Sequence, residues 1–445
     1  MANFRVSVLF VLASSVVLAP NLSAQPTVPR DRAPAVPGSI RPYVDRLYST
    51  EAGVRAEAAC QIGRRHTDAV AAIPILLAML HDDVVVMAPL ECEMSPWMRR
   101  QMKTDPSSFK GWETSPAKEA ADALGDIGDS AVPGLLQALR DANWKVRKFA
   151  AYGLGEGESF IHRTDVIRAL GDRLSDEHPD VRERSAWALG EIEDPAAISS
   201  LSGALGDKDV RVRTMVVWAL GEIEDPSAVP SLLRALKDAE TTVRSKAAWA
   251  LGEIEDGTAM DGLVAALRDV EPSVRRQAVW ALGEIENPGA VDGLAGALHD
   301  TDAQVRRQAA WALGEIESDR AVPSLLRALG DTDIMVRRQV VWALGEIEDP
   351  IAVNGLVKAL ADVDADVRRQ AAWALGEIED NSAVPGLVSA LKDTDWQVRK
   401  TVAWALGEIE DPRALDDLRA AANDASGEVR RAISQAIREL RDKRD

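Results

Sequence analysis

Cysteine and positive charge are both scarce in this sequence of 445 residues. The two cysteines are Cys60 and Cys92, so the chain is not a small scaffold held together by many disulfides. Lys and Arg number 52 against 71 Asp and Glu, which gives a formal net charge of −19. Such an excess of negative charge excludes general binding to the phosphates of nucleic acids.

Motifs for chemistry are missing as well. The five histidines share no common position in the repeat described below, so the sequence predicts no metal cage. It contains no nucleotide-binding loop, no Gly-x-Ser-x-Gly motif and no metalloprotease motif. We therefore expect a protein that is not an enzyme and that needs no cofactor.

The N-terminus has the pattern of a secretory signal. A thirteen-residue apolar run, residues 6–18, follows Arg5, and Leu22-Ser23-Ala24 offers a small-residue cleavage site. The run is too short for a good transmembrane helix. We expect a signal peptide over residues 1–24, cleaved near Ala24, and an exported mature protein that is periplasmic or secreted. Residues 25–42 are rich in proline and are expected to form an extended linker.

A heptapeptide, Trp-Ala-Leu-Gly-Glu-Ile-Glu, recurs every 31 residues between residues 187 and 410. Its tryptophans are eight of the twelve in the sequence, and we call them the tryptophan row. The row comprises Trp187, Trp218, Trp249, Trp280, Trp311, Trp342, Trp373 and Trp404. Such strict self-similarity is typical of stacked units, each too small to bury its own apolar face.

Each unit carries two helical patterns. In one unit, Val229, Leu232, Leu233 and Leu236 follow the spacing i, i+3, i+4, i+7 of an apolar helix face. After a short turn, a second apolar stripe runs over residues 243–254 at the same kind of spacing. We expect an all-α fold, a right-handed α-solenoid of about twelve stacked antiparallel helix pairs over residues 43–445.

Residues 82–116 interrupt the array, and we predict an inserted loop there because three prolines break any full helix pair. A decayed repeat is the alternative. The segment holds a sulfur cluster, Cys92, Met94, Met98 and Met102. These side chains suit Cu(I), or they simply cover the end of the solenoid. Export also permits a Cys60–Cys92 disulfide, which would join the insert to the first repeat.

The repeat resembles the HEAT-like repeats of the phycobilin lyase type. The matching residues are Asp302 to Arg306, Ala312 to Ile316 and Ala321 to Leu329, and the resemblance spans residues 45–442. It implies that one edge of the second helix forms a concave, partner-binding surface. It also implies that an arginine pairs with the aspartate that opens the second helix of the next unit. These arginines are Arg275, Arg306, Arg337 and Arg368, and the aspartates are Asp302, Asp333, Asp364 and Asp395.

The activities found among such relatives are not expected here. Lyase activity implies a cytoplasmic pigment-protein substrate, which the export signal contradicts. Hydroxylases with HEAT-like repeats bind two irons through His-Glu pairs, and this sequence contains no His-Glu dipeptide.

The candidate binding residues share one edge of the second helix. Arg276, Trp280 and Glu284 are spaced i, i+4, i+8, so they line up away from the apolar stripe. The same trio recurs three times, and Tyr152 takes the tryptophan position in a more divergent unit. The recurrences are Arg307, Trp311 and Glu315; Arg338, Trp342 and Glu346; and Arg369, Trp373 and Glu377.

Two interpretations of the tryptophan row are open. Each indole could lie over the neighbouring helix and sandwich an arginine, which would make the array rigid. Alternatively, the indoles could form a binding strip with neighbours about 10 Å apart. We predict a monomeric, non-catalytic scaffold that binds a protein or an extended peptide along the concave face. The alternatives are polysaccharide binding by the tryptophans, and an enzyme or soft-metal protein that uses the insert.

Overall fold

The computed structural model describes residues 29–30, 34–87, 113–157 and 162–442. The expected signal peptide, residues 25–28 and 31–33 of the expected linker, and most of the expected insert therefore lie outside the described residues. The expected linker was wrong at its C-terminal end, because helix α1 begins at Arg41 and the Val36 and Ile40 side chains are buried. The fold is an all-α solenoid of stacked helix pairs, as predicted. The chain divides into two compact units, residues 1–169 and 170–445.

The first unit contains six helices within the described residues and a short two-stranded sheet. The helices are α1 (Arg41–Arg46), α2 (Ala52–Gly63), α3 (Ile73–Met79), α5 (Pro116–Ile127), α6 (Val132–Ala138) and α7 (Trp144–Gly155), with 3₁₀ turns at His66–Ala72 and Gly128–Ala131. Strands β1 (Val86–Met87) and β2 (Glu113–Thr114) are antiparallel, with Val86 opposite Thr114. They join the two described ends of the predicted insert. Helix α8 (Thr164–Arg173) contains the boundary between the units.

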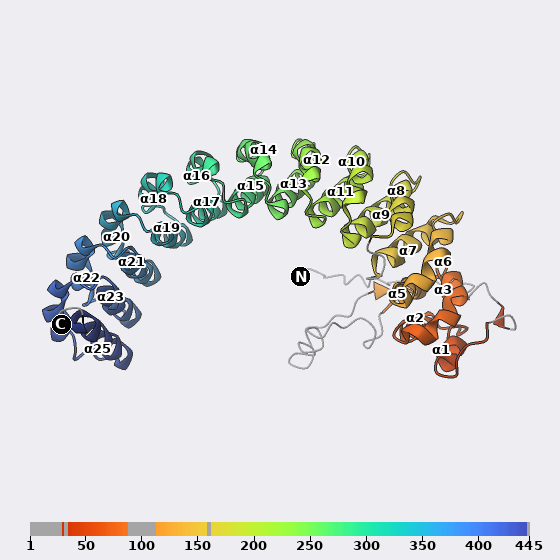
Figure 1. Ribbon diagram of the computed structural model, residues 1–445, viewed down its shortest axis with the longest axis horizontal. Coiled ribbons are helices and arrows are strands. Elements are labelled where there is room, and N and C mark those ends of the chain that lie inside the picture. The colour runs from red at the N-terminus through yellow and green to blue at the C-terminus, as the bar shows by residue number, and fades with distance from the viewer. Residues whose placement is uncertain (1–28, 31–33, 88–112, 158–161, 443–445) are drawn as a thin grey trace, which may run out of the picture. The chain divides into compact units, whose positions relative to one another are not determined.

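The second unit alternates short and long helices. The short first helices are α10 (Ile198–Ala204), α12 (Val229–Ala235), α14 (Met260–Ala266), α16 (Val291–Ala297), α18 (Val322–Ala328), α20 (Val353–Ala359), α22 (Val384–Ala390) and α24 (Leu415–Ala420). The long second helices are α9 (Pro179–Ile192), α11 (Val210–Glu222), α13 (Thr241–Ile254), α15 (Pro272–Glu284), α17 (Ala303–Glu315), α19 (Ile334–Ile347), α21 (Ala365–Ile378), α23 (Trp396–Glu408) and α25 (Gly427–Asp442). Within this unit the second helices form the inner layer of a curved array, and the first helices form the outer layer (Figure 1).

Local sequence explains where these helices begin and end. A 3₁₀ turn precedes each first helix from α10 to α24, and in the turn Pro226–Ala228 the Asp225 side chain accepts a hydrogen bond from the Ser227 N–H. The apolar stripes predicted from sequence are buried: Leu232 and Leu251 are fully inaccessible. Each second helix from α9 to α23 is followed by a left-handed glutamate, such as Glu255 with φ 53°. This conformation is usually taken by glycine or asparagine.

A run of arginine–aspartate pairs joins successive repeats. In the pair of Arg306 and Asp331, Nε and Nη2 of the guanidinium donate to the two carboxylate oxygens at 2.7 and 2.9 Å. Its Nη1 also donates to the backbone carbonyl of Asp300 at 2.9 Å. The guanidinium holds the pKa of Asp331 below its usual range. Eight such pairs follow one another from Arg182–Asp207 to Arg399–Asp424.

The sequence analysis predicted the wrong aspartate as the partner of each of these arginines. Arg275 pairs with Asp300, two residues before the expected Asp302, and the same shift holds for Arg306, Arg337 and Arg368. The physical reason is that Asp302 caps helix α17, where its carboxylate accepts hydrogen bonds from the N–H groups of Gln304 and Val305. The expected partners Asp333 and Asp395 cap α19 and α23 in the same way, and Asp364 caps α21 through Val367.

None of the helices in the described part of the chain combines the length and the apolar character that crossing a membrane requires.

We expect Arg306→Gln to lower the free energy of unfolding by about 2 kcal/mol, because it leaves the part-buried Asp331 carboxylate without its bidentate partner. The neighbouring Arg307→Gln removes the same charge from the same helix and serves as the matched control. Urea unfolding of both variants, followed by circular dichroism, measures the difference. Equal midpoints for the two variants would contradict the assigned role of Arg306.

Candidate functional site on the second helices

The predicted site residues of the second unit lie on the inner-layer helices. All eight indoles of the tryptophan row are half-buried, so each is partly covered by protein and partly open to solvent. In each trio, the arginine lies two residues after the buried valine near the start of the second helix, and the glutamate lies ten residues after it. The structure thus places the trios where the helical spacing predicted.

Seven of the eight indoles pack against a glycine of the preceding repeat. A Cβ added to Gly314 would lie 2.6 Å from Cζ3 of Trp342 and 3.1 Å from Cβ of Ala343. The ring therefore fills the space that the missing side chain leaves, and successive second helices approach closely there. This packing recurs at seven glycines: Gly190, Gly221, Gly252, Gly283, Gly314, Gly345 and Gly376. These indoles hold neighbouring repeats together by packing against the adjacent helix, as predicted by the interpretation in which each indole lies over the neighbouring helix.

The indole nitrogen faces the acidic end of its helix. The N–H of Trp280 donates to the carboxylate of Glu284, four residues later, and Trp342 donates to Glu346 in the same way. Burial raises the pKa of Glu284, the Glu255 carboxylate raises it further, and the indole N–H lowers it. One glutamate per repeat occupies this position. We call these residues the acidic row: Glu191, Glu222, Glu253, Glu284, Glu315, Glu346, Glu377 and Glu408.

The carboxylates of the acidic row lie within electrostatic reach of one another. Burial raises the pKa of Glu346, and the carboxylates of Glu315, Glu317 and Glu377 raise it further. For Glu408, burial acts first and Glu439 of α25 adds to it. The row therefore concentrates negative charge along one side of the indoles.

Three of the basic side chains at the other end of the helices form ion pairs within the protein. Arg338 pairs with Asp364 at 2.9 Å and with Asp366 at 2.6 Å. Arg369 reaches Asp366 at 3.2 Å, and Arg431 pairs with Glu428. We call these positions the basic row: Arg276, Arg307, Arg338, Arg369, Lys400 and Arg431.

A cation lies over the indole in two repeats, an arginine in one and a lysine in the other. Arg184 lies over Trp187 at 4.9 Å from the ring centroid, and Lys246 lies over Trp249 at 4.1 Å. Both cations come from the position three residues before the tryptophan. Most other repeats carry glutamine at that position, for example Gln277.

Two pockets open on this face where the sequence departs from the common repeat. The first, of about 650 Å³, is lined by Trp187, Trp218, Thr214, Met215, Lys246 and neighbours. Thr214 and Met215 stand where Arg-Gln stands in helices α15 to α21. These shorter and more apolar side chains leave the space beside the indoles open.

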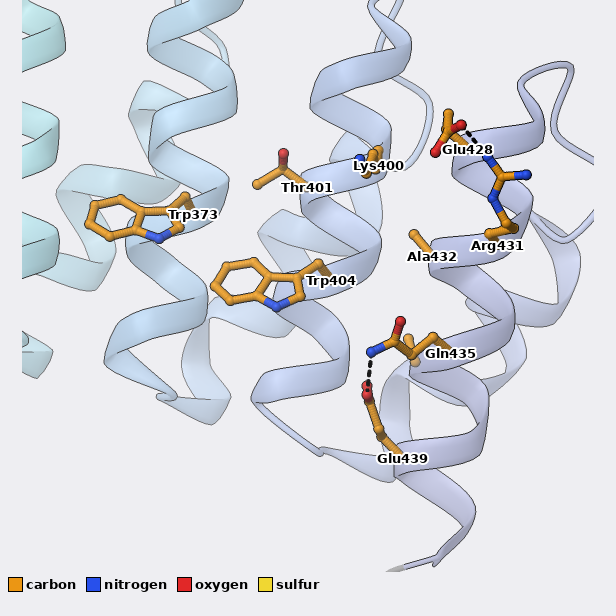
Figure 2. Close-up of a pocket in the computed structure, with 10 residues that line it drawn as sticks. Trp373, Lys400, Thr401, Trp404, Glu428, Arg431, Ala432, Gln435 and Glu439 are labelled. Carbon is orange, nitrogen blue, oxygen red and sulfur yellow. Dashed lines mark hydrogen bonds and ion pairs between the residues drawn. The ribbon is translucent and has the colours of Figure 1, made fainter.

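The second pocket, of about 490 Å³, lies at the C-terminal end of the array. Ala432 and Gln435 of α25 replace the glutamine and the tryptophan of the common repeat. Figure 2 shows the rings of Trp373 and Trp404 on successive helices, with Lys400 near the start of its helix and Glu439 at the opposite end of the pocket. Gln435 donates to Glu439 at 2.9 Å.

Sequence reasoning missed both pockets. The signal was present, because the departures at residues 214–215 and 432–435 are visible against the repeated pattern. A change from the common residues makes a pocket only where the neighbouring indoles are exposed. Their exposure depends on how two adjacent repeats pack, which the sequence does not show.

Tyr152 lies in the first unit, where it belongs to a compact polar cluster. Its hydroxyl donates to the carboxylates of Asp122 and Glu156, and Lys118 lies over its ring at 5.3 Å. Lys118 also pairs with Asp122 at 3.1 Å. Burial raises the pKa of Asp122 to about 6, while Lys118 and Tyr152 lower it. Burial and the same carboxylates raise the pKa of Tyr152.

The sulfur cluster of the predicted insert cannot be placed in this site, because Cys92, Met94, Met98 and Met102 lie outside the described residues. Cys60 is buried in α2, and its pairing with Cys92 stays a prediction. Within the described ranges, no group of three or more His, Cys, Asp or Glu side chains could hold a metal ion.

Family comparison agrees with this geometry. A model of HEAT repeats matches residues 167–242, 231–310, 292–366 and 353–438. The chain belongs to the HEAT repeat family. A single HEAT repeat matches at residues 131–156, and the HEAT-like repeat of phycobilisome (PBS) lyases matches at residues 117–141. No curated protein matches the chain.

Comparison with solved structures gives matches of low sequence identity, one of which has a TM-score above 0.5. A chain in a structure of Kap95p binding to RanGDP is 15% identical with a TM-score of 0.54, and the match covers 90% of this chain and 60% of that one. An engineered protein is 20% identical over 91% and 99% of the two chains, with a TM-score of 0.44. The CpcE and CpcF complex of phycocyanin lyase from Nostoc sp. PCC7120 is 24% identical over 48% and 94%, with a TM-score of 0.32.

We expect Gly314→Ala to destabilise the array by about 1–3 kcal/mol, because the new Cβ meets the Trp342 ring. The matched control is Gly296→Ala in α16, where a Cβ meets nothing within 4 Å. That control should stabilise the helix by up to about 1 kcal/mol. Thermal unfolding of the two variants checks the opposite signs, and stabilisation by both would refute the packing role of the glycine.

The raised pKa of Asp122 gives a pH dependence with a definite sign. Because the folded-state pKa of Asp122 lies above its ordinary value of 3.8, the stability linked to this proton is complete below pH 3.8 and is lost as pH rises through about 6. We expect Asp122→Asn to stabilise the first unit at pH 7.5 by on the order of 1 kcal/mol. The gain should be smaller at pH 5. Urea unfolding at both pH values measures it, and a larger gain at pH 5 would contradict this assignment.

Proposed function

We propose that this chain is a non-catalytic scaffold that binds a protein or an extended peptide along the inner face of the second helices. The observation that carries the proposal is the coincidence of both pockets with the tryptophan row. Trp187 and Trp218 line one pocket, and Trp373 and Trp404 line the other. Half-exposed aromatic side chains in concave surroundings are the residues that dominate protein-binding sites.

The uniformity of the repeats supports an extended partner. Four successive second helices present the same arginine, glutamine, tryptophan and glutamate at the same positions, so the face offers one set of contacts many times. A folded partner with an irregular surface would require different side chains at each step. The divergent positions at 214–215 and 432–435 would then fix where the partner begins and ends.

Polysaccharide binding is the second candidate, and the partly exposed indole faces are the observation that favours it. The N-terminal signal pattern supports an exported compartment for either ligand. The third alternative, based on the sulfur cluster, concerns residues outside the described part of the chain.

A photo-crosslinking residue placed at position 432, inside the second pocket, tests the proposal in the organism's own exported fraction. We expect protease-sensitive adducts from position 432 and none from position 354 on α20, in the outer layer. Because position 432 is itself substituted in the next variant, the crosslinker is moved to position 435 in the same pocket. In that chain, Thr214→Arg, Met215→Gln and Ala432→Gln combined should abolish the protease-sensitive adducts. Four other repeats already carry Arg-Gln, so these changes preserve the fold.

Equal adducts from positions 432 and 354 would contradict the proposal. Adducts from position 432 that resist protease but are removed by glycan hydrolases would favour the polysaccharide instead.

A further inference from the structure

The last helix of the array, α25, holds an arginine in the geometry that binds aspartate elsewhere in the protein. In the preceding repeat, Arg399 donates from Nη1 to the carbonyl of Asp393 and from Nε and Nη2 to the carboxylate of Asp424. Arg430 takes the same position in α25 (Figure 1). Its Nη1 donates in the same way to the carbonyls of Asp424 and Ala425, at 2.6 and 3.1 Å. The side chain is therefore anchored as in the other repeats, but no carboxylate of the described residues pairs with it.

The helix face around Arg430 differs from the equivalent face of the other second helices. Residues 430, 434, 438 and 441 follow the spacing of one helix face, and all four are exposed. In α15 the positions of Ser434 and Arg438 are taken by the buried residues Val279 and Gly283. Gly283 is the residue that lets the next indole approach, so Arg438 prevents a further repeat from packing as the others do.

The sign of the charge on this face indicates its partner. A terminal repeat needs a polar outer surface, but side chains of either sign can supply one. In a chain of net charge −19, every charged residue at these four positions is an arginine. We call them the end-face arginines: Arg430, Arg438 and Arg441.

The end-face arginines differ from the cations beside them. Arg419 of α24 pairs with Asp416 at 3.0 Å. Arg431 pairs with Glu428 (Figure 2). Within the described residues the end-face arginines form no such ion pair, so their positive charge is not compensated by a carboxylate of the protein. Uncompensated positive charge favours an acidic partner.

The length of the face sets the size of the partner segment. Arg430 and Arg441 are separated by about 16 Å along α25, at a rise of about 1.5 Å per residue. An extended chain advances about 3.3 Å per residue, so about six residues cover the same length. A short acidic segment can therefore reach all the end-face arginines at once.

We propose that the end-face arginines bind an acidic segment of another protein, with an aspartate on Arg430 in the place that Asp424 takes on Arg399. Further carboxylates of the segment pair with Arg438 and Arg441. A guanidinium and a carboxylate form two parallel hydrogen bonds, which the array shows at 2.7 and 2.9 Å for Arg399. This surface is separate from the inner face, so the inference does not rest on the proposed function.

The probe copies the loop that supplies the carboxylate within the array. The sequence Asp-Thr-Asp occurs at 300–302, 331–333 and 393–395, and its first aspartate binds the arginine, as Asp393 binds Arg368. The peptide acetyl-(Asp-Thr-Asp-Gly)₂-amide is titrated into the full chain by calorimetry at low ionic strength. We expect saturable binding, at least tenfold tighter than that of the Asn-Thr-Asn peptide of the same length. Equal binding of the two peptides would overturn the inference.

Arg430→Gln tests the anchored arginine, and Arg430→Lys tests its paired hydrogen bonds. We expect each to weaken binding of the acidic peptide at least fivefold, because lysine keeps the charge but cannot form the bidentate contact. The matched control is Arg327→Gln, which removes the same charge from the exposed outer layer at α18. An equal loss in that control, or full affinity in Arg430→Lys, would contradict the proposed contact.

Arg438→Gln keeps the test valid if the loop contacts of Arg430 are needed for folding. Arg438 is exposed and forms no printed contact to the loop, so its replacement should leave thermal unfolding unchanged. We expect this variant to bind the acidic peptide at least threefold more weakly. Full affinity in a folded Arg438→Gln chain would overturn the extended acidic segment.

Two other occupants would give distinct results. Tighter binding of single-stranded DNA than of the acidic peptide would overturn the inference, since phosphate would then be the preferred ligand. A dimer that forms with rising concentration in analytical ultracentrifugation, and that Arg430→Gln abolishes, would also overturn it, because a second copy of the chain would supply the carboxylate. Adducts at position 432 test the proposed function separately, so the two can fail independently.

Discussion

The close approach of successive second helices is the constraint on which the second unit depends. Glycine at the end of Ala-Leu-Gly removes the side chain that would hold the helices apart, and the next repeat's indole fills the space, as at Gly314 and Trp342. The two residues act as one contact across the repeat boundary. Their recurrence explains why the heptapeptide is the most uniform stretch of the chain, since a change in either partner disturbs two repeats.

A second contact secures the opposite end of the same helices. The pair of Arg306 and Asp331 joins the first turn of one second helix to the loop before the next second helix, while the indole joins these helices farther along. Two separate contacts per boundary fix both the spacing and the rotation of each repeat. A regular spacing of the half-exposed indoles follows from this, and the proposed partner depends on that regularity.

Much of this architecture could be predicted from the sequence, because periodicity directly reports which residues share a helix face. The apolar stripes and the edge with Arg276, Trp280 and Glu284 were predicted correctly. The partner of each of these arginines could not be predicted, since Asp300 and Asp302 flank the same turn and helix capping decides between them. The raised pKa of Asp122 depends on burial between helices, and the left-handed glutamates contradict local preference. Neither has a sequence signature.

The central claim is that each indole packs against the neighbouring repeat with one side of its ring and exposes the other side to a partner. The solvent exposure of Trp280, Trp311 and Trp342 tests it most directly. Incorporation of 5-fluorotryptophan, with resonances assigned by single Trp→Phe substitutions, allows the H₂O-to-D₂O isotope shift of each indole to be measured by ¹⁹F NMR. The account predicts shifts between those of buried and free fluorotryptophan, nearly equal at the three positions. Shifts close to zero would show that the indoles are entirely covered, and would contradict their role in binding.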